Sequence, residues 1–190
     1  MCGFLSADPA FRSGTGKCPA CGAPGDGRRE FPPQRLRRLD TRVRTYRHEG
    51  ESEVVVILAA TFLESLLEDI LARIMKAHGA TDRLSATVLD TERSIGQRIG
   101  RLFPALTGVQ FEDAAAELGF REFPRRWRAL RTERNAFIHD SSFEGVQEEL
   151  TDASANEAMQ LLDQAYKLFV LINNRFVAGE RRRRRDDDRP

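Results

Sequence analysis

Apolar residues recur at helical spacing over most of this chain, and the pattern predicts an all-α fold. The clearest element is one long helix from Ser52 to about Gly79, with Ser52 as its N-cap and Gly79 as its C-terminal stop. Its apolar residues follow the 3.6-residue period of an α-helix and stand at positions 55, 58, 59, 62, 66, 67, 70, 71 and 74.

Other segments have the same period. Further helices are predicted at residues 34–48, 91–103, 111–118, 125–138 and 153–177. Pro104 is expected to end the helix at 91–103, Gly119 to stop the next one, and Pro124 to stand in the first turn of the helix after that. Residues 140–152 have the character of a loop. No stretch alternates like a β-strand, so we expect an up-down helical bundle of four to five core helices.

The bundle is expected to occupy residues 34–178, with its core in residues 50–178. Residues 1–33 are rich in Gly and Pro and have no apolar period, which predicts an irregular N-terminal segment. Residues 179–190 consist largely of Arg and Asp and predict a disordered tail. The helix at 34–48 combines an apolar stripe with a basic face that is made of Arg35, Arg37, Arg38, Arg42, Arg44 and Arg47.

Composition excludes some classes of protein. The chain has 190 residues, of which 41% are hydrophobic, so one domain with a real core is expected. The formal net charge is only +1, and the core is mildly acidic, so the whole molecule is not a general binder of polyanions. No apolar run is long enough to span a membrane, and the N-terminus lacks the pattern of a signal peptide. We therefore expect a cytoplasmic protein without membrane contact.

One short motif carries candidate chemistry. Arg134 and His139 stand five residues apart, with Asn135 directly after the Arg. Arg binds phosphate through two parallel N–H bonds and stays charged, and His transfers protons near neutral pH, so the two residues suffice to cleave RNA without a metal. The same interval joins Arg73 to His78, but only the later pair has a polar residue after its Arg and precedes the last long helix.

The motif and the order of the helices resemble the HEPN superfamily, in particular its RNase-type and toxin-like members. The resemblance covers roughly residues 50–178, and the segment 62–68 is similar to the first long helix of such domains. It implies a metal-independent endoribonuclease that acts in toxin–antitoxin or phage-defence systems, a homodimer with two facing motifs, and a possible antitoxin partner. Many members only bind RNA or partner proteins, so a non-catalytic binding module is the alternative. A third reading is an inert bundle with regulatory tails.

In the catalytic interpretation, His139 acts on the ribose 2′-OH as general base or on the leaving 5′-oxygen as general acid. Arg134 stabilises the pentacovalent phosphate, and Asn135 orients His139 or binds the phosphate. The products have 2′,3′-cyclic phosphate ends, and no cofactor is required. In the competing interpretation, Arg134 and His139 are only the polar end of a bundle helix, and Arg134 is paired with a carboxylate.

Neighbouring residues could support this site. Arg131 and Arg128 would extend a phosphate-binding strip or form a solvated basic face. Glu64, among the apolar residues of the long helix, could hold Arg131 or Arg134 in place or be a plain surface residue. Asp140 could tune the pKa of its neighbour His139. Trp127 is expected in the core rather than as a platform for stacking bases.

Helix geometry constrains the motif. Residues five apart on an ideal helix lie about 140° apart around its axis, so Arg134 and His139 cannot point to one spot from a straight helix. Asn135 and His139, four apart, share a face. Either the helix ends near residue 138 and His139 swings round, or a second subunit completes the site.

The N-terminal segment contains a possible metal site. Cys18 and Cys21 have the spacing and turn residues of a zinc knuckle. A structural zinc takes four ligands, for which Cys2 could be the third and His48 the fourth, or two protomers could share one metal. The alternative is a thiol pair without a metal in a reducing cytosol. Any zinc is expected to be structural rather than catalytic.

Overall fold

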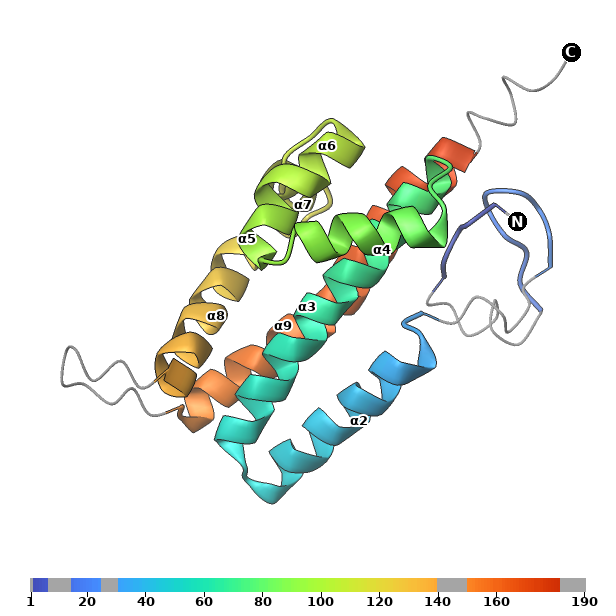
Figure 1. Cartoon of the computed structure of the whole chain (residues 1–190). Helices are drawn as coiled ribbons and strands as arrows, with labels where there is room; N and C mark the ends of the chain where they lie inside the picture. The colour runs from blue at the N-terminus through green and yellow to red at the C-terminus, as the bar shows by residue number, and fades with distance from the viewer. Residues whose placement is uncertain (1, 7–14, 25–30, 140–149, 182–190) are drawn as a thin grey trace, which may run out of the picture.

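The computed structural model describes residues 2–6, 15–24, 31–139 and 150–181 (Figure 1). The regular elements of these residues are all helical, and the only bridge between extended residues joins Lys17 to Pro24. The all-α prediction is therefore confirmed. Most of the predicted loop and of the predicted tail lies outside the described residues.

The helices follow one another in chain order. They are α2 (Gln34–Glu49), α3 (Ser52–Ala77), α4 (Asp82–Thr91), α5 (Ile95–Gln97), the π-helical turn η2 (Arg98–Leu102), α6 (Phe103–Thr107), α7 (Phe111–Glu117), α8 (Phe123–His139), α9 (Asp152–Asn173) and the π-helical turn η3 (Asn174–Ala178). The predicted helices at 34–48, 111–118 and 125–138 match α2, α7 and α8 within two residues at each end, and the predicted helix at 153–177 matches the start of α9 within one residue.

The long helix α3 forms the centre of the bundle. It packs mainly against α9 and α2, and also against α8 and α4. The helices α2 and α8 run in the opposite direction to α3 and α9, as expected for an up-down arrangement (Figure 1). Thirteen residues of α3, distributed between Val55 and Ala77, are buried. This burial by several neighbouring helices explains why apolar residues occur on more than one side of α3.

One end of the bundle is filled by aromatic side chains. Phe111, Phe123, Trp127 and Phe169 come from α7, α8 and α9, and their ring centroids lie 5.8–6.5 Å apart. Most of these rings meet edge to face or tilted, which is the geometry that aromatic pairs prefer. Trp127 is 1% exposed, so its predicted place in the core is confirmed.

The long helix ends as predicted but begins slightly differently. Gly79 has φ 89°, its N–H donates to the carbonyl of Lys76, and the N–H of Ala80 donates to that of Met75. This pair of bonds is a Schellman motif, so the C-terminal stop is confirmed. Ser52, however, is the first helical residue rather than the N-cap, and its hydroxyl lies 2.5 Å from Oδ1 of Asp152 on α9.

The predicted helix at 91–103 is wrong at both ends. Thr91 ends the separate helix α4, and the next helical stretch begins at Ile95, after a capping box built by Ser94. It then continues through Pro104 to Thr107. The wide π-helical turn η2 ends at Leu102, two residues before Pro104, and such a turn moves the preceding carbonyls away from where the proline ring would meet them in a regular α-helix.

The end of α9 also differs from the prediction. The helix continues through η3 to Arg181, so residues 179–181 belong to the bundle rather than to a tail. None of the helices described here is long and apolar enough to cross a membrane.

Candidate functional site

Arg134 lies on the inward face of α8. Trp127 and Leu130 of the same helix are buried, Phe137 is partly buried, and Arg134 falls between them at helical spacing. A guanidinium in this position has lost much of its water and needs a partner of opposite charge. The helix α8 therefore turns Arg134 toward α3 rather than toward solvent.

Glu64 of α3 is that partner. Its Oε1 accepts a hydrogen bond of 2.8 Å from Nη2 of Arg134, and it lies 3.5 Å from Nε of Arg131. The side chains of Arg134, Arg131 and Glu64 are 15%, 23% and 25% exposed. The expected contact of Glu64 with Arg131 or Arg134 is present for both. Two guanidiniums share one carboxylate, so these three residues, the Glu64 cluster, have a net positive charge.

The cluster leaves some hydrogen-bonding capacity unused. The Nε atoms of Arg134 and Arg131 are buried, and neither has a hydrogen-bond partner among the residues described. The distance of 3.5 Å from Arg131 to Glu64 is in the range of an ion pair but is too long for a good hydrogen bond. Buried donors without partners are uncommon and mark sites that deserve a functional explanation.

Arg128 occupies a different environment from Arg131 and Arg134. Its side chain is 71% exposed, and its Nη2 lies 3.2 Å from Oε1 of Glu112 on α7. Beside it, a pocket of about 130 Å³ opens between η2 and α8, with Arg128, Arg131 and Glu112 among its walls. This volume is below the roughly 300–1,000 Å³ of typical ligand pockets, so the pocket can accept one chemical group and not a whole nucleotide.

The remaining motif residues lie at the end of α8. Asn135 is exposed, and Ile138, one turn beyond it, is 49% exposed. His139 is the last residue of α8, so the helix ends near residue 138, as one of the two expected arrangements requires. The side chain of His139 and all of Asp140 lie outside the described residues. Position 139 is about 140° around the α8 axis from Arg134, so one chain does not bring these two positions onto one face.

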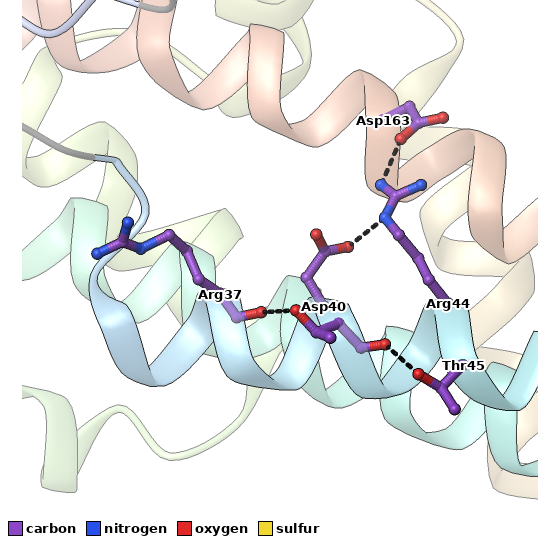
Figure 2. A network of polar contacts seen from close by, with 6 residues as sticks. Arg37, Asp40, Arg44, Thr45 and Asp163 are labelled. Carbon is purple, nitrogen blue, oxygen red and sulfur yellow. Dashed lines mark hydrogen bonds and ion pairs between the residues drawn. The ribbon is translucent and has the colours of Figure 1, made fainter. Parts of the chain in front are cut away.

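The sequence did not reveal how the basic face of α2 is used. In Figure 2, Arg44 reaches from α2 to α9: its Nη2 donates to Asp163 at 2.7 Å, and its Nε donates to Asp40 at 3.0 Å. One turn further along α2, Arg47 binds Asp152 and Asn156 of α9. Part of the predicted basic face therefore binds side chains of α9. Arg35, Arg38 and Arg42 are exposed on the same helix.

The buried side of the α2–α9 contact carries a shifted pKa. Burial and the neighbouring Asp40 raise the pKa of Tyr166, so this phenol stays protonated. The apolar stripe predicted for this helix is confirmed, because Leu36 and Val43 are buried and Leu39 packs against the core.

The three cysteines gather at one place. The sulfur atoms of Cys2, Cys18 and Cys21 all lie within 4.8 Å of one another. Cys2 therefore joins the predicted knuckle as a third candidate ligand. His48, suggested as a fourth, does not belong to this group; it is exposed in the last turn of α2.

Comparison of the chain with protein-family models, with curated proteins and with solved structures finds no match.

Proposed function

We propose that the chain is a metal-independent endoribonuclease of the HEPN type that cleaves RNA to 2′,3′-cyclic phosphate ends. The observation that carries this proposal is the Glu64 cluster, in which a net positive charge is fixed on α8 at Arg131 and Arg134, next to the exposed Asn135 and five positions before His139 in the sequence. Phosphoryl transfer without a metal needs at least a fixed cation that stabilises the charge on the phosphate and a residue that transfers protons.

The reaction would be a transesterification within the RNA chain. The ribose 2′-oxygen attacks phosphorus, its proton passes to a base, and the P–O5′ bond breaks as the 5′-oxygen takes up a proton. His139 serves as the base or as the acid, and Arg134 stabilises the additional negative charge of the pentacovalent phosphate. Asn135 orients His139 or hydrogen-bonds the phosphate. DNA lacks the 2′-oxygen and is not cleaved.

The proposal includes a homodimer. Arg134 is held toward α3 by Glu64, whereas position 139 lies on another side of α8. A second copy would supply the His139 that faces this Arg134. Because Ile138 is 49% exposed beside the motif, it gives such an interface an apolar contact. A role as a toxin or phage-defence protein, with or without an antitoxin, follows from the resemblance alone and belongs to the same proposal.

The second candidate function is a non-catalytic module that binds RNA or a partner protein. It is favoured by the contact of Arg134 with Glu64, because a guanidinium that is already paired can serve stability alone. The exposed residues Arg35, Arg38 and Arg42 would then bind phosphates, and the affinity would fall steeply as salt increases.

One experiment separates the two functions. End-labelled RNA is incubated with the purified full-length chain in EDTA, beside His139→Ala and Arg134→Ala, with His48→Ala and Arg125→Ala as matched controls on exposed helix positions. Cleavage to cyclic-phosphate ends should fall about 10²–10⁴-fold in His139→Ala and persist in both controls.

Two outcomes would contradict the proposed enzyme. Bound RNA without any cleavage by the wild-type chain supports the binding module instead. Equal cleavage by the wild-type chain and by His139→Ala shows that this histidine is not the catalytic one. A parallel reaction without chelator and without Mg²⁺ shows whether a loss of cleavage in EDTA comes from removal of a metal bound to the protein.

A further inference from the structure

We infer that Cys2, Cys18 and Cys21 bind a structural Zn²⁺ that joins the start of the chain to the end of the bundle. These are the three cysteines of the chain, and the structure brings all of them together although Cys2 precedes Cys18 by sixteen positions. This site lies in the N-terminal segment and is independent of the proposed RNase chemistry on α8.

The separation of the Cys2 and Cys18 sulfur atoms fits a tetrahedral zinc, and the sulfur of Cys21 lies near both. With Zn–S bonds of about 2.3 Å, tetrahedral geometry places two sulfur ligands about 3.8 Å apart. The Sγ atoms of Cys2 and Cys18 are 3.6 Å apart, and all three sulfurs lie within 4.8 Å of one another. This separation is well beyond the roughly 2.05 Å of a disulfide. Thiolates also select zinc over the oxygen-seeking Ca²⁺ and Mg²⁺.

The turn at Cys18 is shaped as a metal knuckle. The carbonyl of Cys18 accepts hydrogen bonds from the N–H groups of Cys21 (3.4 Å) and Gly22 (2.7 Å), and the N–H of Cys18 donates to Ala23. Gly22 has φ 69°, which glycine adopts without strain. These backbone bonds hold Cys18 and Cys21 in one turn, so the two cysteines stay near each other.

The bundle itself holds Cys2 in position. The amide nitrogen of Asn173 donates to the carbonyl of Gly3 at 2.8 Å. The side chain of Asn174 bonds both backbone groups of Leu5, at 2.8 Å each. These bonds dock residues 3–5 onto the end of α9 and the start of η3.

The close fit at Gly3 adds to this docking. Gly3 has φ 78°, and a Cβ at this position would lie 3.0 Å from Cγ1 of Val177. Only glycine satisfies both conditions, so the residue next to Cys2 is fixed in place.

The surroundings of the sulfurs favour a structural metal over a reactive one. Cys2 and Cys18 are each 2% exposed, and Phe4 and Ala20 pack against them. Cys21 lies at the surface and leaves one side of the site open. A fourth ligand on this side would be a water molecule, because no other His, Cys, Asp or Glu among the described side chains joins the group.

The test is metal analysis of the tag-free, fully reduced full-length chain by mass spectrometry. We expect about one zinc per chain in the wild type and in the knuckle control Pro19→Ala, and at least a tenfold loss in Cys2→Ser, Cys18→Ser and Cys21→Ser. Zinc-free wild-type protein that takes up no added Zn²⁺ would overturn the inference, as would a Cys21→Ser variant with full zinc content. Iron in place of zinc would contradict the choice of metal.

A second measurement stays informative if a variant does not fold. Co²⁺ added to the reduced apo wild-type chain should give the intense visible absorption of tetrahedral cobalt and a thiolate charge-transfer band, and Zn²⁺ should displace both. Removal of the metal should expose the N-terminal segment to protease while the helical circular dichroism remains. Only weak absorption, as octahedral Co²⁺ gives, would refute a thiolate site.

Discussion

Replacement of Glu64 by Gln tests whether the Glu64 cluster is a real structural unit. The substitution keeps the shape of the side chain but removes the charge that Arg134 and Arg131 share. An exposed ion pair contributes about 0.2–1 kcal/mol, and breaking a fully buried pair costs about 3–5 kcal/mol. Because these side chains are 15–25% exposed, the cost should lie between the two limits, at about 1–2 kcal/mol.

This cost is measurable by thermal denaturation. For a chain of this length, each 1 kcal/mol lowers Tm by about 2–4 °C, so Glu64→Gln should lower Tm by about 2–8 °C. The matched control is Glu112→Gln. It removes the charged partner of the exposed Arg128, which lies on α8 like Arg134, and it should cost no more than about 1 kcal/mol.

A double-mutant cycle isolates the bond itself. The stabilities of wild type, Glu64→Gln, Arg134→Met and the double variant should give a coupling energy of about 1 kcal/mol or more. The reasoning fails if Glu64→Gln costs no more than Glu112→Gln, or if the coupling energy is indistinguishable from zero. In that case Arg134 would not be fixed by Glu64, and the geometric support for the proposed function would be lost.

Three further predictions concern the dimer, the acid stability and the core. A mixture of Arg134→Ala and His139→Ala chains, each inactive alone, should regain RNA cleavage after exchange of subunits; no recovery in verified mixed dimers would exclude a site that spans two chains. Arg126 lowers the pKa of Glu157 chiefly by hydrogen bonding, so this pair stabilises the fold above the ordinary pKa of a Glu and loses its effect as the pH falls. Glu157→Gln should therefore destabilise the chain more at pH 7 than at pH 3. If the variant's denaturation midpoint differs from that of wild type by the same amount at both pH values, the prediction is refuted. Trp127→Ala should cost about 3–5 kcal/mol by chemical denaturation, and a cost near 1 kcal/mol would contradict its place in the core.

The helices were largely predictable because their signals are local. The spacing of apolar residues, the glycine stops and Pro124 are visible within a few turns of sequence. The helices α2, α7 and α8 match their predicted ranges closely, as does the start of α9. The helix α4 was missed because its apolar pattern is weak: Leu84 is 52% exposed, and only Ser85 and Leu89 are buried. Its position depends on the hydroxyl cap of Thr81 and on packing against α3, which a single segment does not reveal.

The contacts that build the sites were only partly predictable. The inward position of Arg134 follows from its spacing with Trp127 and Leu130, and it calls for an acidic partner; Glu64 was a candidate because it stands among apolar residues of a long helix. By contrast, the link from Arg44 to Asp163 spans 119 residues between exposed side chains, and no pattern selects that partner. Cys2 comes close to the knuckle because Asn173 binds the neighbouring Gly3, and the spacing of apolar residues gives no sign of this contact.

The geometry of α8 decides how an active site could be assembled. Trp127 and Leu130 anchor the inward face, and rotating α8 by 140° would expose both. A buried tryptophan covers roughly 150–250 Å², so exposing Trp127 alone costs about 4–6 kcal/mol at 25 cal/mol per Å². This is a large part of the 5–15 kcal/mol that stabilises a typical domain. One chain therefore cannot turn Arg134 and position 139 toward the same phosphate in succession. In the proposed enzyme, two α8 helices that face each other across a dimer would therefore place Arg134 of one copy and His139 of the other beside the same phosphate.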